Sequence, residues 1–243
     1  MLRIRLSATL RCSLLAAALL ACAHAAAADE VKVSAAIDAA QTGMVEIRTL
    51  APDIAMDIRY AGRDNFTGDV VPGYEAAACY LLQPVAEALA RVQHDLRAGG
   101  YSLQIYDCYR PVPAVHSFVD WVGQPDDPQA KQRHYPNVAK DTLIDEGYIA
   151  STSGHSRGAT VDLGLLDCRS GRCEPLDMGT PFDFFDPIAH TETPGLSDAQ
   201  RENRKRLLDA MARRGFANYP KEWWHFTFHP EPDPTTAYGF PVR

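Results

Sequence analysis

The chain has 243 residues, of which 46% are hydrophobic and 23% charged, and its formal net charge is −7. This length and balance are typical of a globular protein with one domain or two small ones. The acidic charge argues against nucleic-acid binding, which needs clustered Lys and Arg, and the 17 Pro and 16 Gly are too scattered for a collagen-like or long disordered chain.

Residues 1–28 have the features of a secretion signal. Three arginines and an apolar run at residues 13–23 precede small residues that would permit cleavage near position 25 or 28. The run is shorter than a membrane span, and no polar face interrupts it as in a buried amphipathic helix, which is the alternative. A lipoprotein signal would instead be cut before Cys22. We expect export to the periplasm, with or without a lipid anchor, and no transmembrane segment in the mature chain.

Removing the signal would take the net charge from −7 to −10 and leave four cysteines, at positions 79, 108, 168 and 173. Four cysteines in an exported protein predict two disulfides, for which three pairings exist. Cys168 and Cys173 bracket a turn and favour a short closed loop, which leaves Cys79 with Cys108. Four unpaired thiols are the alternative, and a zinc-binding quartet is disfavoured because no CxxC pair occurs.

Hydrophobic spacing predicts the elements of the first half of the mature chain. Apolar residues at steps of three and four predict a helix at residues 81–98, which Gly99 and Gly100 end. A strand is expected at residues 101–109. The Pro-, Asp- and Gln-rich stretch at residues 123–137 is expected to be a surface loop.

The second half contains two strands and a helix. Alternating apolar residues predict a strand at residues 160–166, and residues 223–228 are rich in aromatic and β-branched side chains, which favours a late strand. Between them, Ser197 and Gln200 form a capping box that begins a helix running to Gly215. Helices and strands without a regular βαβ alternation predict an α+β fold with one core.

Two short stretches carry the chemistry. In SGHSRGATVD, residues 153–162, Asp162 lies on the opposite strand face from the apolar residues, and His155 precedes it by seven positions. In EWWHF, residues 222–226, Glu222 and His225 lie among aromatic rings. The two would point to opposite faces of a regular strand, so we expect the strand to begin after Glu222 or to contain a bulge.

Taken singly, the acid is more often a solvated surface group and each histidine a core residue. Together, two histidines and one aspartate are a three-ligand zinc set that leaves a fourth position for water, and a nearby carboxylate is the general base that such a site needs.

These stretches fit the SxHxxGxxxD and ExxH signatures of the zinc D-Ala-D-Ala peptidases, and the chain resembles the VanX-type D-alanyl-D-alanine dipeptidases of that family. The resemblance covers roughly residues 45–240. Three further stretches support it: DIRY followed by DNFTG at residues 57–68, YRP at 109–111 and MGTPFD at 178–183. It implies one α+β domain at residues 29–243, with a mainly antiparallel sheet, flanking helices and a zinc site on the sheet, as in Hedgehog and D-Ala-D-Ala peptidase folds.

The resemblance also implies residue roles. One Zn²⁺ per chain would be held by His155, Asp162 and His225, with Glu222 as the general base and Arg110 stabilising the developing oxyanion. His229 is the competitor of His225 as ligand.

Ser153 and Asp183 match positions near the substrate, and Asp183 is the natural partner of a free ammonium, although Asp186 lies close by in the sequence. Two residues depart from the family pattern. Thr160 replaces a usual Ala, and Cys108 stands where a smaller residue is common, so that a disulfide there could brace Arg110.

The implied activity is hydrolysis of free D-Ala-D-Ala, a small peptide substrate, to two D-alanines. The alternatives are a D,D- or L,D-carboxypeptidase that trims peptidoglycan stem peptides and a non-catalytic wall-binding module. Glu222 and Arg110 weigh against the binding module, and Asp183 favours the dipeptidase. The export signal favours the carboxypeptidase, because the free dipeptide is made in the cytoplasm. Nothing in the sequence predicts the oligomeric state.

Overall fold

The computed structural model describes residues 31–243, so the predicted secretion signal lies outside the described residues. The chain folds around one six-stranded sheet with the strand order β3-β5-β6-β9-β8 and with β7 paired to β6. Only β3 is parallel to its neighbour, so the sheet is mainly antiparallel, as expected. Its strands are β3 (Ala55–Met56), β5 (Tyr101–Asp107), β6 (Thr160–Asp167), β7 (Glu174–Pro175), β8 (Phe216–Asn218) and β9 (His225–Phe228).

Two small sheets lie beside the main one. Strand β2 (Met44–Glu46) pairs with β4 (Tyr80–Leu82), and β1 (Lys32–Val33) pairs with β10 (Thr236–Ala237) near the C-terminus. The β2–β4 pair matters for the site, because Tyr80 and Leu82 hydrogen-bond to the two loops that carry site residues, at Tyr109 and Gly158.

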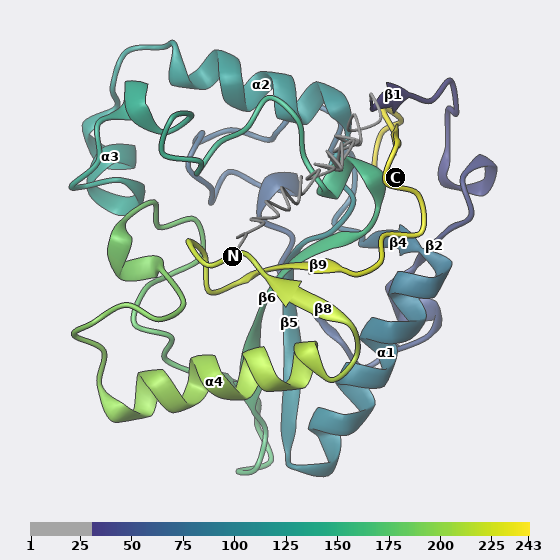
Figure 1. Ribbon diagram of the computed structural model, residues 1–243, viewed down its shortest axis with the longest axis vertical. Helices are drawn as coiled ribbons and strands as arrows, with labels where there is room; N and C mark the ends of the chain where they lie inside the picture. The colour runs from purple at the N-terminus through teal and green to yellow at the C-terminus, as the bar shows by residue number, and fades with distance from the viewer. Residues whose placement is uncertain (1–30) are drawn as a thin grey trace, which may run out of the picture.

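Helices α1 (Gln83–Ala98) and α4 (Asp198–Ala212) pack side by side against the sheet (Figure 1). Val85, Leu89, Val92 and Leu96 of α1 are buried, each contributing about 1.5–3 kcal/mol of hydrophobic stabilisation. The two helices are joined at their ends by an ion pair between Arg214 and Asp95. Helices α2 (Val112–Val122) and α3 (Pro128–His134) lie toward the other end of the sheet.

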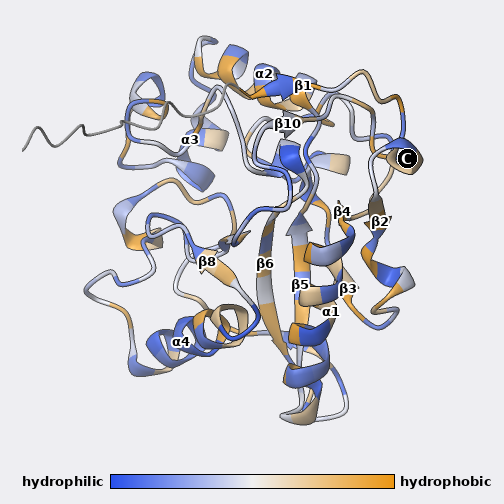
Figure 2. Cartoon of the chain, turned by 45° about the vertical axis from the view of Figure 1, so that its right-hand side comes forward, coloured by the Kyte–Doolittle hydropathy of each residue, from blue (hydrophilic) through white to orange (hydrophobic). Residues whose placement is uncertain are grey.

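The core sits between these layers, with β5 and β6 at its centre. Hydrophobic residues recur along both strands, whereas the outer side of α4 is largely hydrophilic (Figure 2). Strand β6 is buried on both faces, so Asp162 is enclosed rather than solvated. The described residues include no helix that is long and apolar enough to cross a membrane.

The predicted elements are present with shifted ends. Helix α1 begins two residues later than expected because β4 occupies Tyr80–Leu82, and the Ser197–Gln200 capping box begins α4. The expectation of a surface loop at residues 123–137 was wrong in part. Its first residues are exposed, but α3 follows, and His134 and Tyr135 at its end are buried.

Both predicted disulfides are formed, Cys79–Cys108 and Cys168–Cys173. The alternatives of free thiols and of a cysteine zinc site are therefore wrong. The first bond is buried and joins the start of β4 to the end of β5, whereas the second closes an exposed turn.

Candidate metal centre

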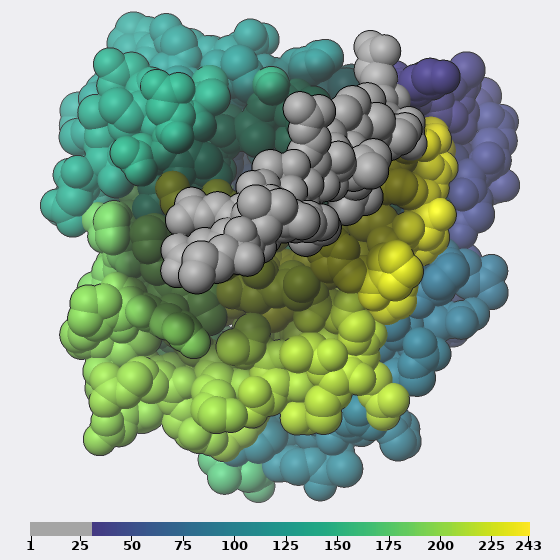
Figure 3. Space-filling view, in the orientation of Figure 1, coloured from purple at the N-terminus to yellow at the C-terminus, as the bar shows by residue number. Residues whose placement is uncertain are grey.

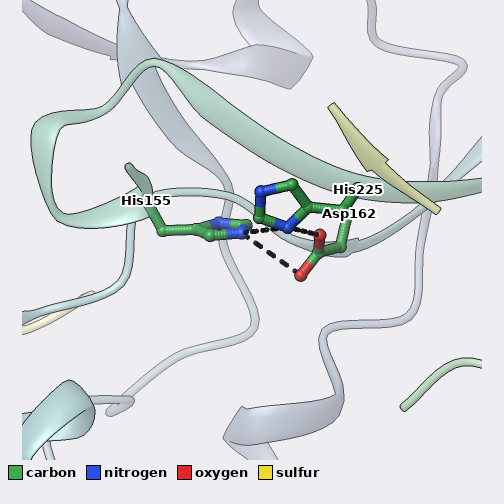
Figure 4. A group of neighbouring side chains, drawn as sticks. All are labelled: His155, Asp162 and His225. Atoms are coloured by element: carbon green, nitrogen blue, oxygen red, sulfur yellow. Dashed lines mark hydrogen bonds and ion pairs between the residues drawn. The ribbon is translucent and has the colours of Figure 1, made fainter. Parts of the chain in front are cut away.

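His155, Asp162 and His225 converge on one point (Figure 4). Pairing of β6 with β9 places Asp162 directly opposite His225, and His155 lies in a short 3₁₀ helix, His155–Arg157, that precedes β6. The Asp162 carboxylate lies 3.0 Å from His225 Nδ1 through Oδ1 and 3.3 Å from His155 Nε2 through Oδ2. The two imidazole nitrogens are 3.4 Å apart.

A tight turn brings His155 back toward Asp162. Gly158 ends the 3₁₀ helix with φ of +70°, a conformation that costs other residues about 1–2 kcal/mol. A Cβ at this position would also lie 2.6 Å from Met44 Cε. The turn that lets His155 and Asp162 converge across seven positions therefore requires glycine at position 158.

The three residues fit a zinc ion. Asp162 Oδ1 is buried and has no hydrogen-bond partner among residues 31–243, although His225 Nδ1 faces it. His155 Nδ1 bonds at 2.7 Å to the Cys108 carbonyl, which leaves Nε2 free to face the other two ligand atoms. Two imidazoles and one carboxylate whose lone pairs face one another are a donor set that Zn²⁺ prefers, with one position left open.

The two imidazoles act on Asp162. Burial alone would raise the pKa of this carboxyl, but the adjacent His155 and His225 lower it below its usual range. Among the residues that the structure describes, the group that could hold a metal ion includes His225 and not its competitor His229.

Glu222 lies beside the ligands without belonging to them. A turn in which His225 N–H donates to the Glu222 carbonyl precedes β9, so the strand begins after Glu222 and the two side chains converge. Glu222 Oε2 is 3.5 Å from His225 Nδ1, and burial raises the pKa of Glu222 well above its usual value. This position beside the three residues makes Glu222 a candidate for proton transfer at the site.

Arg110 approaches the same point from the loop after β5. Its Nη2 lies 3.4 Å from Asp162 Oδ2, and its guanidinium stands 5.1 Å from the ring centres of Tyr60 and Phe118. Sequence reasoning missed Asp107, which is fully buried and accepts hydrogen bonds from Arg110 Nε at 2.9 Å and Tyr74 OH at 2.6 Å. The available sequence signal was an acidic residue three positions before Arg110, at the end of the predicted strand.

Asp183 and Ser153 line the cavity next to the ligands, and Asp186 does not. Asp183 is buried, accepts a hydrogen bond from Tyr60 OH at 3.1 Å through Oδ1, and has no partner at Oδ2. Burial raises the pKa of its carboxyl. Asp186 instead caps a short 3₁₀ helix and bonds to Asn137.

The cavity has a volume of about 340 Å³ and combines these polar groups with an aromatic wall. Tyr148 and Tyr219, which sequence reasoning did not single out, are part of that wall together with Trp224. In the space-filling view, the teal surface of α2 and α3 borders the green surface of the residues that follow them in the chain. Helix α4 lies below both (Figure 3). The cavity is lined by residues from both of these parts of the chain.

Most of the chain is similar to known peptidases. The model of the M15 peptidase family described as D-ala-D-ala dipeptidase matches residues 40–243. The D-alanyl-D-alanine dipeptidase of Streptomyces coelicolor is 43% identical over 79% of this chain and 95% of its own length. That of Enterococcus faecalis is 40% identical over 83% of this chain and 99% of its own length. A solved Zn(II) complex of the vancomycin-resistance D,D-pentapeptidase VanY is 17% identical, covers 63% of this chain and 75% of that one, and has a TM-score of 0.37.

Proposed function

This chain belongs to the D-Ala-D-Ala dipeptidase family of metallopeptidases, and from that premise we propose that it hydrolyses D-Ala-D-Ala to two D-alanines with one zinc ion held by His155, Asp162 and His225. The observation that carries this proposal is the unpartnered Asp162 Oδ1, which faces an imidazole nitrogen at 3.0 Å beside a buried glutamate and arginine. A wall-binding module would need neither Glu222 nor Arg110.

Bound zinc would supply a Lewis acid that polarises the peptide carbonyl and lowers the pKa of water to about 7. Glu222 takes the proton of the attacking water and delivers it to the leaving amine as the carbon–nitrogen bond breaks. Burial raises the pKa of Glu222, which makes its carboxylate a stronger base for this transfer. The Arg110 guanidinium faces the same point and stabilises the negative charge that develops on the carbonyl oxygen.

Asp183 gives the site its preference for a free dipeptide. Its Oδ2 is buried without a partner in the cavity, and the ammonium of an unblocked substrate would satisfy it. Ser153 lines the same cavity and contributes to substrate placement. A stem peptide has no ammonium at that position, so it would leave the Asp183 carboxyl unpaired.

A direct assay tests the activity. Zinc-loaded protein is offered D-Ala-D-Ala and an N-acetylated peptide ending in D-Ala-D-Ala, with and without a chelator. We expect chelator-sensitive release of D-alanine from the free dipeptide alone. Turnover of the blocked peptide alone would identify a carboxypeptidase, and no activity on either would favour a binding module.

We also propose that the enzyme is exported, on the strength of the signal features of residues 1–28 and of the two disulfides, which persist in oxidising compartments. The mass of the mature chain from a bacterial host would show cleavage near residue 25 or 28, or before Cys22 with lipid attached. A mature chain that keeps Met1 and is found in the cytoplasm would contradict export.

A further inference from the structure

The buried Cys79–Cys108 disulfide lies directly behind the metal centre. Cys108 is the first residue after β5, where ladder pairing has ended, and Cys79 immediately precedes β4. The Cys79 carbonyl accepts a hydrogen bond from Ile47 at 3.0 Å, so this end of the bridge is fixed to the buried core.

The other end of the bridge supports a proposed ligand. The Cys108 carbonyl accepts the bond from His155 Nδ1 at 2.7 Å, and this bond orients the imidazole so that Nε2 faces Asp162. Such outer contacts of a metal-ligating histidine fix its tautomer and direction, and losing one typically costs about 10- to 100-fold in metal affinity or activity.

The same loop also carries Arg110. Arg110 N donates to the His155 carbonyl at 3.3 Å, and the Arg110 carbonyl accepts from Ser156 Oγ at 2.8 Å. The loop is tied to β4 at one further point, where Tyr109 N donates to the Tyr80 carbonyl at 3.0 Å. A shift of Cys108 would therefore displace both His155 and Arg110.

We propose that the Cys79–Cys108 disulfide is a positioning element that holds His155 and Arg110 in register, so that metal affinity and turnover depend on the oxidation of this pair. The statement about turnover rests on the proposed function, whereas the statement about metal affinity does not. The bond forms from two thiols by exchange with a disulfide donor, which is reduced to two thiols. In a reducing compartment the chain would keep the looser, dithiol form of the site.

The second disulfide provides a matched control. Cys168 and Cys173 close an exposed turn of residues 168–173, and among the described residues the hydrogen bonds of Cys168 go to Gly100 and Gly171 rather than to the metal centre. Removing it changes the chain by one disulfide in the same way, without touching His155 or Arg110.

The test compares two double variants. The first carries Cys79→Ala and Cys108→Val, and the control carries Cys168→Ala and Cys173→Ala. Three quantities are measured for each: the zinc dissociation constant by competition with a chelator, kcat and KM on D-Ala-D-Ala, and the melting temperature of the zinc-free protein. For the first variant we expect zinc affinity and kcat lower by about 10- to 100-fold, with KM changed by less than about threefold. The control should keep zinc affinity and kcat within about twofold.

A bridge that only stabilises the fold would lower the melting temperature but leave zinc affinity and kcat of the folded variant within about twofold of the wild type, and that result would overturn the proposal. If the first variant, with Cys79→Ala and Cys108→Val, does not fold, the control variant is used instead. Its Cys79–Cys108 bond is reduced with a phosphine. The phosphine takes oxygen from water as the two thiols form, and the same three measurements follow after the thiols are counted. Failure of the wild type to cleave D-Ala-D-Ala would contradict the proposed function and still leave the zinc comparison decisive.

Discussion

Asp162 contacts three of the proposed functional groups through its two carboxylate oxygens: both imidazoles and the Arg110 guanidinium. Because it is buried, its charge would be costly without these partners, and they keep the carboxyl ionised. Asp107 plays the matching part behind Arg110, whose Nε it holds. At the scale of single residues, the centre therefore has an excess of buried carboxyls over the single Arg110 guanidinium, which a bound cation would balance.

Arg110→Ala should lower kcat by about 10²–10³-fold, because one donor to the developing oxyanion is lost. Arg110→Lys should recover only part of the loss, since lysine cannot keep both the Nε contact to Asp107 and the Nη2 contact to Asp162. Steady-state kinetics with circular dichroism as a folding check measure this. A kcat within about threefold of the wild type would contradict the assigned role.

Asp183→Asn should lower kcat/KM for D-Ala-D-Ala by about 10- to 100-fold, because a charge-assisted bond to the substrate ammonium contributes about 1.5–3 kcal/mol. The matched control is Asp186→Asn, three residues away and outside the cavity, which should keep kcat/KM because asparagine also caps helices. An equal loss in the two variants would point to a role of this loop in folding rather than in binding.

At the scale of elements, each proposed ligand is supplied by a local rule of backbone structure. The turn after the His155–Arg157 helix needs a glycine, the β6–β9 pairing sets Asp162 against His225, and the turn before β9 brings Glu222 to the same side as His225. These rules act within a few residues, but each element is held in place by contacts with another one.

Gly158→Ala should destabilise the fold by at least about 1–2 kcal/mol and weaken zinc binding, because the added Cβ meets Met44 and the positive φ disfavours alanine. Gly171→Ala is the control: its φ is +88°, but nothing lies within 4 Å of an added Cβ, and it sits in the exposed turn. Chemical denaturation and chelator competition measure the two effects. Unchanged zinc affinity in Gly158→Ala would show that the turn does not set the ligand positions.

At the scale of the whole molecule, the centre joins parts of the chain that are far apart in sequence. His155 and Asp162 precede His225 by about sixty or seventy positions, and Arg110 comes from the loop after β5, the strand paired with β6. A metal bound here would link the 3₁₀ helix, β6 and β9, and so would stabilise the folded state against the unfolded one.

Zinc at about 100 times its dissociation constant should stabilise the protein by about 2.7 kcal/mol, which corresponds to a rise in melting temperature of roughly 5–10 °C for a domain of this size. Differential scanning calorimetry with and without chelator measures it. In Asp162→Asn the rise should disappear, and a rise of the same size in that variant would place the zinc elsewhere.

The motifs explain why so much of the site was predictable. His155, Asp162, Glu222 and His225 occur in two short stretches whose spacing is set by turns and strand period, which are local properties of the chain. The buried helix face of α1 and the capping box of α4 were predictable for the same reason, and only their ends moved.

The sequence by itself predicted the fold class, favoured the cysteine pairing that the structure contains, and pointed through the family motifs to the proposed metal ligands, because periodicity, a short loop between two cysteines and motif spacing are local properties of the chain. Tertiary structure alone decided which of Asp183 and Asp186 faces the cavity and that the Cys108 carbonyl supports His155. The contact between His155 and Cys108 joins residues about 50 positions apart. The choice between Asp183 and Asp186 depends on which face of their loop is buried. No local pattern encodes them, since they arise only when β5, β6 and the loops beyond them pack together.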